Sequence, residues 1–225
     1  MRHRCWVSGE SGRPLQEVVD ALRQRHGWLV SYEDPPFDAD QDLVDVTASV
    51  RRDGHLERKV FVPRGGPFTF IYDLPAAAET GPASILRTLL DDYALTDYPG
   101  TFEVRASAPL FHVVPTSVRG RDGRSRPITS ILDTRVTLVE GRRSVATLLD
   151  EVTADVSRQI GVHVGFGPGA DNLLLQSFVQ GGAVNEPARQ VITRALGTVN
   201  RPATWDLRYA PRFGAYMMGV VYLSR

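Results

Sequence analysis

Cysteine is almost absent from this sequence, and its scarcity excludes two kinds of stabilising chemistry. Cys5 is the only cysteine among 225 residues, so the chain forms no internal disulfide bond and no metal site that needs several thiolates. Long hydrophobic runs are also missing, because no stretch approaches the roughly 18 apolar residues of a membrane-spanning helix. The basic start at residues 1–6 is not followed by an apolar run of signal-peptide length. We therefore expect no transmembrane segment, and no signal peptide is visible.

Net charge is the second feature that the sequence lacks. Twenty-six basic residues balance twenty-six acidic residues, and neutrality argues against a chain built to coat nucleic acid or an anionic membrane. Lys59 is the only lysine, so 26 − 1 = 25 of the basic residues are arginines. We interpret this excess of arginine as the bias of a GC-rich genome, in preference to a demand for guanidinium chemistry. The sequence therefore predicts no nucleic-acid partner.

A short pattern is present twice in the chain. Residues 101–105 read TFEVR and residues 204–208 read TWDLR, so the two copies match class for class. Each copy is followed by Ala-Pro and then by an apolar segment. Because repeated patterns determine the architecture of a chain, we predict two copies of one small α/β unit. The composition, 42% hydrophobic and 23% charged, is that of a folded protein with real cores.

Each copy contains two segments in which apolar residues recur at helical spacing. The first segment begins at Pro14, where the missing N–H of proline costs nothing, and it ends before Gly27, a typical C-cap residue. Its counterpart in the second copy ends before Gly161, and the other two helices are expected to begin at Pro82 and Pro187. The apolar positions are Leu15, Val18, Val19 and Leu22; Ile85, Leu86, Leu89 and Leu90; Val145, Leu148, Leu149, Val152 and Val156; and Val191, Ile192, Ala195 and Leu196.

The remaining segments are typical of strands, so each copy reads β-α-β-β-α-β-β. The predicted fold class is α/β (α+β), with two tandem copies of a small two-layer unit whose helices pack on one face of a mixed sheet. The first repeat covers residues 1–118 and holds an extra hairpin within 43–72, turned at Asp53-Gly54. The second repeat covers 131–225, and its residues 173–179 are predicted as a strand. Residues 119–130, rich in arginine and glycine, predict a linker.

These patterns resemble the short N-terminal domain of secretins and TonB-dependent receptors. The resemblance rests on the ranges 14–22 and 27–32, on 82–90 and 102–114, and on 187–196 and 205–223. The chain departs from that family in the weak Ala195-Leu196 pair and in the extra hairpin near Asp53-Gly54, and a generic α/β tandem is the alternative. The resemblance implies a non-catalytic module of the bacterial envelope. Such modules dock onto other proteins, or onto copies of themselves, through sheet edges and helix faces.

Motifs of catalytic and cofactor sites are incomplete. The serine in residues 9–12 misses the nucleophile-elbow spacing by one residue. The glycine-rich stretch 165–169 contains Pro168 and precedes a predicted strand, whereas a phosphate loop precedes a helix. Adjacent carboxylates at 33–34, 91–92 and 150–151 point in different directions, which favours solvated surface. The histidines show no metal-ligand spacing, and they are His3, His26, His55, His112 and His163. We predict no catalytic residue, no cofactor and no metal, and interpret His26 as favoured by the helix macrodipole alone.

Arginines cluster around the predicted linker. They are Arg119, Arg121, Arg124, Arg126, Arg142 and Arg143. The planar fork of arginine suits phosphate and carboxylate groups, but no aromatic residue is interleaved to stack bases. We favour a charged flexible linker, with an acidic partner such as the loop 37–45 as the alternative.

The sequence thus predicts a non-enzymatic protein-interaction or assembly module of a bacterial cell envelope protein. Its contact surface is expected at exposed strand edges, whose unpaired N–H and C=O groups suit a partner strand or self-association. The periplasm or cell envelope is the expected location, and the cytoplasm stays open. The alternative is a small-molecule-binding protein or enzyme with a cleft between the two repeats, which converging groups such as Arg105, His112 and His163 would support.

Overall fold

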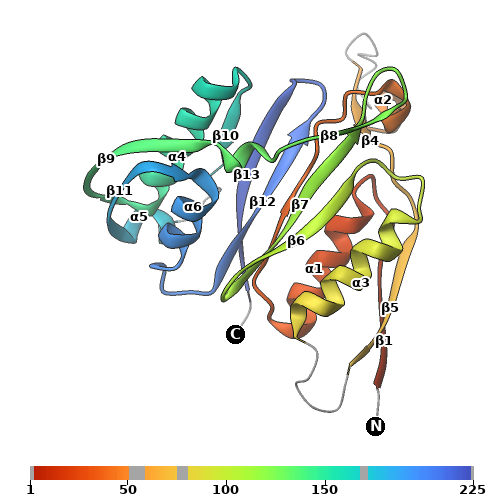
Figure 1. Ribbon diagram of the computed structural model, residues 1–225, viewed down its shortest axis with the longest axis horizontal. Coiled ribbons are helices and arrows are strands. Elements are labelled where there is room, and N and C mark those ends of the chain that lie inside the picture. The colour runs from red at the N-terminus through yellow and green to blue at the C-terminus, as the bar shows by residue number, and fades with distance from the viewer. Residues whose placement is uncertain (1–2, 51–58, 75–80, 168–171, 224–225) are drawn as a thin grey trace. The chain divides into compact units, whose positions relative to one another are not determined.

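The chain folds into two compact units of mixed α/β structure. A computed structural model describes residues 3–50, 59–74, 81–167 and 172–223. The first unit comprises residues 1–128 and 211–213, and the second comprises 129–210 and 214–225 (Figure 1). The mixed α/β class predicted from the sequence is confirmed. The boundary at Ile128 and Thr129 lies within the range 119–130.

The elements of the two units follow one another in a similar order. Those of the first unit are β1 (His3–Gly9), α1 (Pro14–His26), β2 (Val30–Glu33), the 3-10 turn η1 (Asp40–Asp42), β3 (Leu43–Asp45), α2 (Thr47–Val50), β4 (Phe61–Pro63), β5 (Phe68–Leu74), α3 (Pro82–Ala94), β6 (Thr101–Ser107), β7 (Leu110–Arg119) and β8 (Ser125–Pro127). Those of the second unit are the 3-10 turn η2 (Ile131–Asp133), β9 (Arg135–Ser144), α4 (Val145–Ile160), β10 (Val164–Phe166), α5 (Asn172–Gln176), β11 (Phe178–Pro187), α6 (Ala188–Leu196), β12 (Ala203–Ala210) and β13 (Ala215–Tyr222).

The strands of both units pair according to the same scheme. In the first unit β1 is antiparallel to β5, β2 is parallel to β7, and β6 is antiparallel to β7. In the second unit β9 is antiparallel to β11, β10 is parallel to β13, and β12 is antiparallel to β13. Positions in one unit therefore have counterparts in the other that are defined by strand register. That the match arose by duplication stays a prediction.

The sequence predicted helices on one face of a single sheet in each unit, and the structure differs from this prediction. The strands divide between separate sheets, and the helices contact strands of both, for instance α1 with β1 and β2, and α4 with β9 and β10. Figure 1 shows α1 and α3 between the β1–β5 pair and the β6–β7 strands. The buried residues of α1 extend from Pro14 to Arg23 around the helix, an arc of about half its circumference at 3.6 residues per turn. A buried arc this wide is shielded from water only when strands pack on the helix from two sides.

The helix ends follow the sequence prediction closely. Gly27 and Gly161 end α1 and α4 in the left-handed conformation, with φ of 66° and 70°. This conformation suits glycine because it has no Cβ. Pro14 and Pro82 occupy the first turns of α1 and α3, as expected. Ser144, which the sequence analysis did not single out, caps α4 because its hydroxyl accepts a hydrogen bond from the Thr147 amide at 3.1 Å.

Each unit has its own hydrophobic core, and the predicted apolar stripes supply much of it. In the first unit the buried cluster joins both helices to both sheets, and it includes Leu15, Val18, Val19, Leu22, Phe70, Tyr72, Leu86, Leu89 and Val113. In the second unit the buried residues include Leu148, Leu149, Val152, Val156, Val191, Ile192, Trp205 and Leu207. The helical spacing therefore identified the buried positions correctly.

Two predicted strand segments are wrong. The first strand of the predicted hairpin, residues 43–50, is one of them: residues 47–50 form the short helix α2, because the Asp45 carboxylate accepts a hydrogen bond from the Thr47 amide at 2.9 Å and turns the chain. The neighbouring strands β3 and β4 do pair as predicted, and the turn at Asp53-Gly54 lies outside the described residues.

The second wrong segment is 173–179. Residues 172–176 form the helix α5, and the strand is β11, which begins at Phe178. The glycines in β11 weaken its sequence signal, but Gly182 is needed, since a Cβ there would lie 2.8 Å from the Cα of Glu140. Pro187 ends this strand as the N-cap of α6, which begins one residue later than predicted.

The stretch predicted as a linker contains an ordered hairpin. β8 pairs antiparallel with the end of β7, from Ser117↔Pro127 to Arg119↔Ser125. A tight turn around Gly123, with φ of 79°, connects the two strands. This segment therefore continues the first unit up to its boundary, where the sequence predicted a free connection.

The alternation of burial along β5 generates a stability prediction. Phe70 is fully buried and its neighbour Ile71 is 50% exposed. We expect Phe70→Ala to lower the free energy of unfolding by about 3–5 kcal/mol, whereas Ile71→Ala changes it by less than about 1 kcal/mol. Urea unfolding followed by circular dichroism measures both. Equal losses for the two variants would contradict the register of β1 and β5.

Candidate functional site

The outer face of the β1–β5 sheet carries an exposed apolar pair. Trp6 and Ile71 lie directly opposite each other in the register, and they are 66% and 50% exposed. The alternate residues Val7 and Phe70 point the other way, into the core of the first unit. Cross-strand neighbours on one face lie close enough to act as one surface. This surface, here called the Trp6 face, is apolar at its centre.

The backbone edge of β1 borders the Trp6 face. The Arg25 guanidinium donates a hydrogen bond to the Trp6 carbonyl at 3.0 Å, so this carbonyl is directed to a side chain and away from β5. Alternate residues of an antiparallel strand direct their backbone groups to the same side. The amides and carbonyls of Arg4 and Ser8 therefore face the same side as those of Trp6.

The counterpart edge in the second unit is covered by side chains at several positions. Gln159 donates to the Arg135 carbonyl at 2.8 Å, and the Asp155 carboxylate accepts from the Thr137 amide at 3.3 Å. Arg143 donates to the Val139 carbonyl. Charged and polar side chains that occupy strand edges in this way prevent pairing with other chains. On β1 the described side-chain contact of this kind is the one from Arg25 to the Trp6 carbonyl. The backbone edge of β1 is therefore more accessible to another strand than the edge of β9.

A second feature is a cavity of about 280 Å³ on the strands β10, β13 and β12 of the second unit. Asp206 and Arg208 of β12 line it, together with Met217 and Gly219 of β13 and Gly167 after β10. The register pairs Asp206 with Gly219 and Arg208 with Met217, so all four lie on one face. The intervening residues, Trp205, Leu207 and Met218, are buried.

The same register positions in the first unit carry other side chains. Ser31 and His112 stand where the second unit has Gly165 and Met217, and their side chains are joined by a hydrogen bond of 2.7 Å. Val114, opposite Glu103, stands where the second unit has Gly219. An acid and an arginine recur in both units, as the Arg105–Glu103 pair at 2.5 Å and the Arg208–Asp206 pair at 3.5 Å.

The residues considered for a small-molecule cleft are distributed over both units. Arg105 and His112 are direct neighbours in the β6–β7 register, whereas His163 belongs to the second unit, just before β10. Within the described ranges, no group of three or more His, Cys, Asp or Glu side chains is arranged to hold a metal ion.

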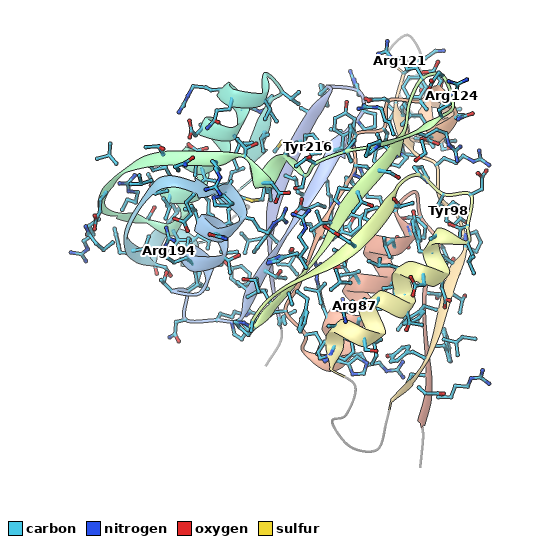
Figure 2. The ribbon with its side chains drawn as sticks, in the orientation of Figure 1. Arg87, Tyr98, Arg121, Arg124, Arg194 and Tyr216 are labelled. Carbon is cyan, nitrogen blue, oxygen red and sulfur yellow. The ribbon has the colours of Figure 1, made fainter. Side chains whose placement is uncertain are left out.

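The arginine-rich segment meets the acidic loop 37–45. Arg126 forms an ion pair with Asp38, and Arg119 lies 3.3 Å from Asp42 and 3.0 Å from Asp97. Burial raises the pKa of the Asp42 carboxyl, and Arg119 opposes this rise. Figure 2 shows Arg121 and Arg124 at the tip of the β7–β8 hairpin. Arg119 and Arg126 therefore pair with the acidic loop 37–45, as the alternative interpretation of the sequence proposed.

The two other arginines of the predicted patch belong to the second unit. Arg142 lies over the Phe178 ring, 5.2 Å from its centroid, and Arg143 pairs with Glu151. Both contacts are made between neighbouring elements of that unit. These arginines therefore have structural roles within the second unit, whereas the hairpin arginines belong to the first.

One of the adjacent carboxylate pairs is not solvated surface. Glu33 and Asp34 at the end of β2 are both buried, and the Asp34 carboxylate accepts a hydrogen bond from Arg13 at 2.7 Å. Burial raises the pKa of Tyr32, and the nearby charge of Asp34 raises this pKa further. Sequence spacing gave no sign of this arrangement, because Arg13 and Asp34 belong to different elements.

Comparison with protein-family models, with curated proteins and with solved structures found no match to this chain. Across the described residues, no helix combines the length and the apolar character needed to cross a membrane.

The side chain of His26 makes specific contacts, in addition to the macrodipole interaction that the sequence suggested. Its Nε2 shares a hydrogen bond of 2.7 Å with the Tyr72 hydroxyl, and its ring stacks on Trp28 at 4.5 Å. Burial of the ring, together with the charge of Arg25, lowers the pKa of His26. A helix C-terminus alone would raise this pKa, so burial is the larger effect.

The lowered pKa of His26 predicts a loss of stability in mild acid. The folded chain binds fewer protons than the unfolded chain as the pH falls through about 6.5, so the free energy of unfolding decreases in that range. We expect His26→Phe, which keeps an aromatic ring against Trp28, to flatten this dependence between about pH 5 and pH 7. Urea titrations at several pH values measure it. An equally steep dependence in the variant would show that another group is responsible.

Proposed function

We propose that the chain is a non-enzymatic protein-interaction or assembly module of a bacterial cell envelope protein, and that it binds an extended segment of a partner along β1. The observation that carries this proposal is the Trp6 face, which adjoins a backbone edge with few side-chain contacts. An extended segment placed there would take over the Trp6 carbonyl from Arg25 and use the amides of Arg4 and Ser8. Main-chain hydrogen bonds supply affinity in this mode of recognition.

The Trp6 face supplies specificity in the same mode. Every second side chain of the docked segment would lie on the Trp6 face, and an apolar side chain opposite Trp6 would bury exposed area on its ring, with Ile71 one strand further on. Tryptophan is among the residues that contribute most to binding energy at protein interfaces. A two-stranded sheet is also only marginally stable by itself, so a third strand would strengthen β1 and β5.

The envelope location rests on the sequence resemblance. Each unit has the strand–helix–strand and strand–helix–hairpin order on which the resemblance to the N-terminal domain of secretins and TonB-dependent receptors is based. The neutral charge balance also fits a protein partner better than a nucleic acid. The periplasm or cell envelope is accordingly the proposed compartment.

A small-molecule-binding role is the second candidate. The observation that favours it is the cavity over Gly219, which lies within the second unit. It involves none of the residues of the Trp6 face, so both roles are compatible with one chain.

A photo-crosslinking amino acid at Ser8 tests the docking proposal in bacterial cells. We expect it to capture a defined envelope protein, because Ser8 lies on the open side of β1, whereas the same group at Leu95, an exposed apolar residue after α3, does not. The interacting segment is then made as a peptide. We expect Trp6→Ala to weaken its binding to the purified chain at least about tenfold, as measured by fluorescence anisotropy.

Two further variants distinguish strand pairing from a simple apolar patch. Ser8→Pro removes an amide on the open side of β1 and should abolish peptide binding, whereas Leu95→Ala should leave the affinity unchanged. Circular dichroism checks that each variant is folded. Equal crosslinking from Ser8 and Leu95, or an unchanged affinity in Trp6→Ala, would refute docking at β1.

A further inference from the structure

The cavity of the second unit lies where Gly219 takes the place of a larger side chain on one sheet face. A Cβ built on Gly219 has no heavy atom within 4 Å, so the space above this residue is open. At the corresponding position the first unit has Val114, which is fully buried. Gly165 likewise stands where the first unit has Ser31. The two faces have the same strand pairing, and the face of the second unit holds the cavity.

Apolar groups form the floor and one wall of this cavity. The Met217 side chain lies over Gly165, since a Cβ on that glycine would be 2.7 Å from the Met217 sulfur, and the Met217 methyl extends toward Gly167. Val221 follows on the same face of β13. A thioether is flexible and polarizable and adapts to the shape of an apolar ligand. The cavity therefore suits a branched aliphatic or aromatic group.

Two opposite charges stand beside the apolar wall. The Arg208 guanidinium and the Asp206 carboxylate are 3.5 Å apart, with side chains 55% and 3% exposed. An anionic ligand alone would be attracted by Arg208 and repelled by Asp206, and a cationic ligand alone would meet the reverse. A ligand that carries both charges next to each other would place a counter-charge beside each residue, in addition to the contacts they already make.

We propose that this cavity binds a free α-amino acid with an apolar side chain. Its carboxylate pairs with Arg208, whose planar fork matches a carboxylate, and its ammonium group faces Asp206. Its side chain occupies the space above Gly219, against Met217 and Val221. The volume of about 280 Å³ lies just below the range of about 300–1,000 Å³ for pockets that take drug-sized ligands, which suits a ligand as small as an amino acid. The proposal uses no residue of the first unit and is independent of docking at β1.

Methionine-methyl NMR tests the proposal directly. The chain has three methionines, so the labelled methyl signals are few, and Met218, buried on the opposite face of β13, is an internal control. We expect L-leucine or L-phenylalanine to shift the Met217 methyl signal saturably, with a smaller effect on Met218. The probes 4-methylpentanoate and isoamylamine, which lack the ammonium and the carboxylate respectively, should bind at least about tenfold more weakly.

Matched variants connect binding to the cavity. Arg208→Gln should weaken leucine binding at least about tenfold, and Arg105→Gln, the corresponding change in the first unit, should leave it unchanged. Gly219→Val should abolish binding because it fills the cavity as Val114 does in the first unit, and Gly219→Ala, a smaller change, should weaken it. The dispersion of the methyl spectrum shows that each variant is folded.

Three results would overturn the assignment. They are no shift of Met217 with either amino acid at millimolar concentration, equal binding of 4-methylpentanoate or isoamylamine, and leucine binding that survives both Gly219→Val and Arg208→Gln.

Discussion

The wide buried arc of the helices is the constraint on which both units depend. In α1 and in α4 the buried residues occupy about half of the helix circumference. One sheet covers a narrower stripe than this, so the strands separate into two sheets that contact each helix from different sides. Burial of these helices is the main source of stability in each unit. As a consequence, the strands that contact the helices turn every second residue toward them and the intervening residues away from them.

The two units have the same strand pairing, but they differ in the side chains on the sheet faces that are turned away from the helices. The first unit exposes Trp6 and Ile71 on one sheet, and on the other it fills the face with the hydrogen-bonded pair Ser31 and His112. In the second unit the corresponding face is open at Gly219, whereas the Met217 side chain covers Gly165. These side chains can differ because the pairing of the strands depends on backbone hydrogen bonds. The same strand pairing therefore carries the exposed Trp6 and Ile71 in the first unit and the cavity over Gly219 in the second.

The arginines that dominate the basic residues are used largely within the fold. Arg119 and Arg126 hold the β7–β8 hairpin against the acidic loop, and Arg13 satisfies the buried Asp34. Ion pairs that are partly exposed add little to overall stability, but they determine where loops lie. The balance of basic and acidic residues thus reflects internal pairing between segments distant in sequence.

The sequence by itself determined the features that depend on near neighbours. The α1 and α4 stripes, the C-cap glycines Gly27 and Gly161, and the strands β6, β7, β12 and β13 all follow from spacing within a few residues. Tertiary structure alone decided the division into two sheets, the helix at 172–176, the strand β11 with its two glycines, and the burial of Glu33 and Asp34. The Trp6 face and the cavity over Gly219 belong to the second group. The Trp6 face depends on the pairing of Trp6 with Ile71, which are far apart in sequence. The cavity depends on which strands lie beside Gly219 and on the sheet face to which this glycine belongs. Local periodicity encodes neither the pairing of distant strands nor the space that a glycine leaves.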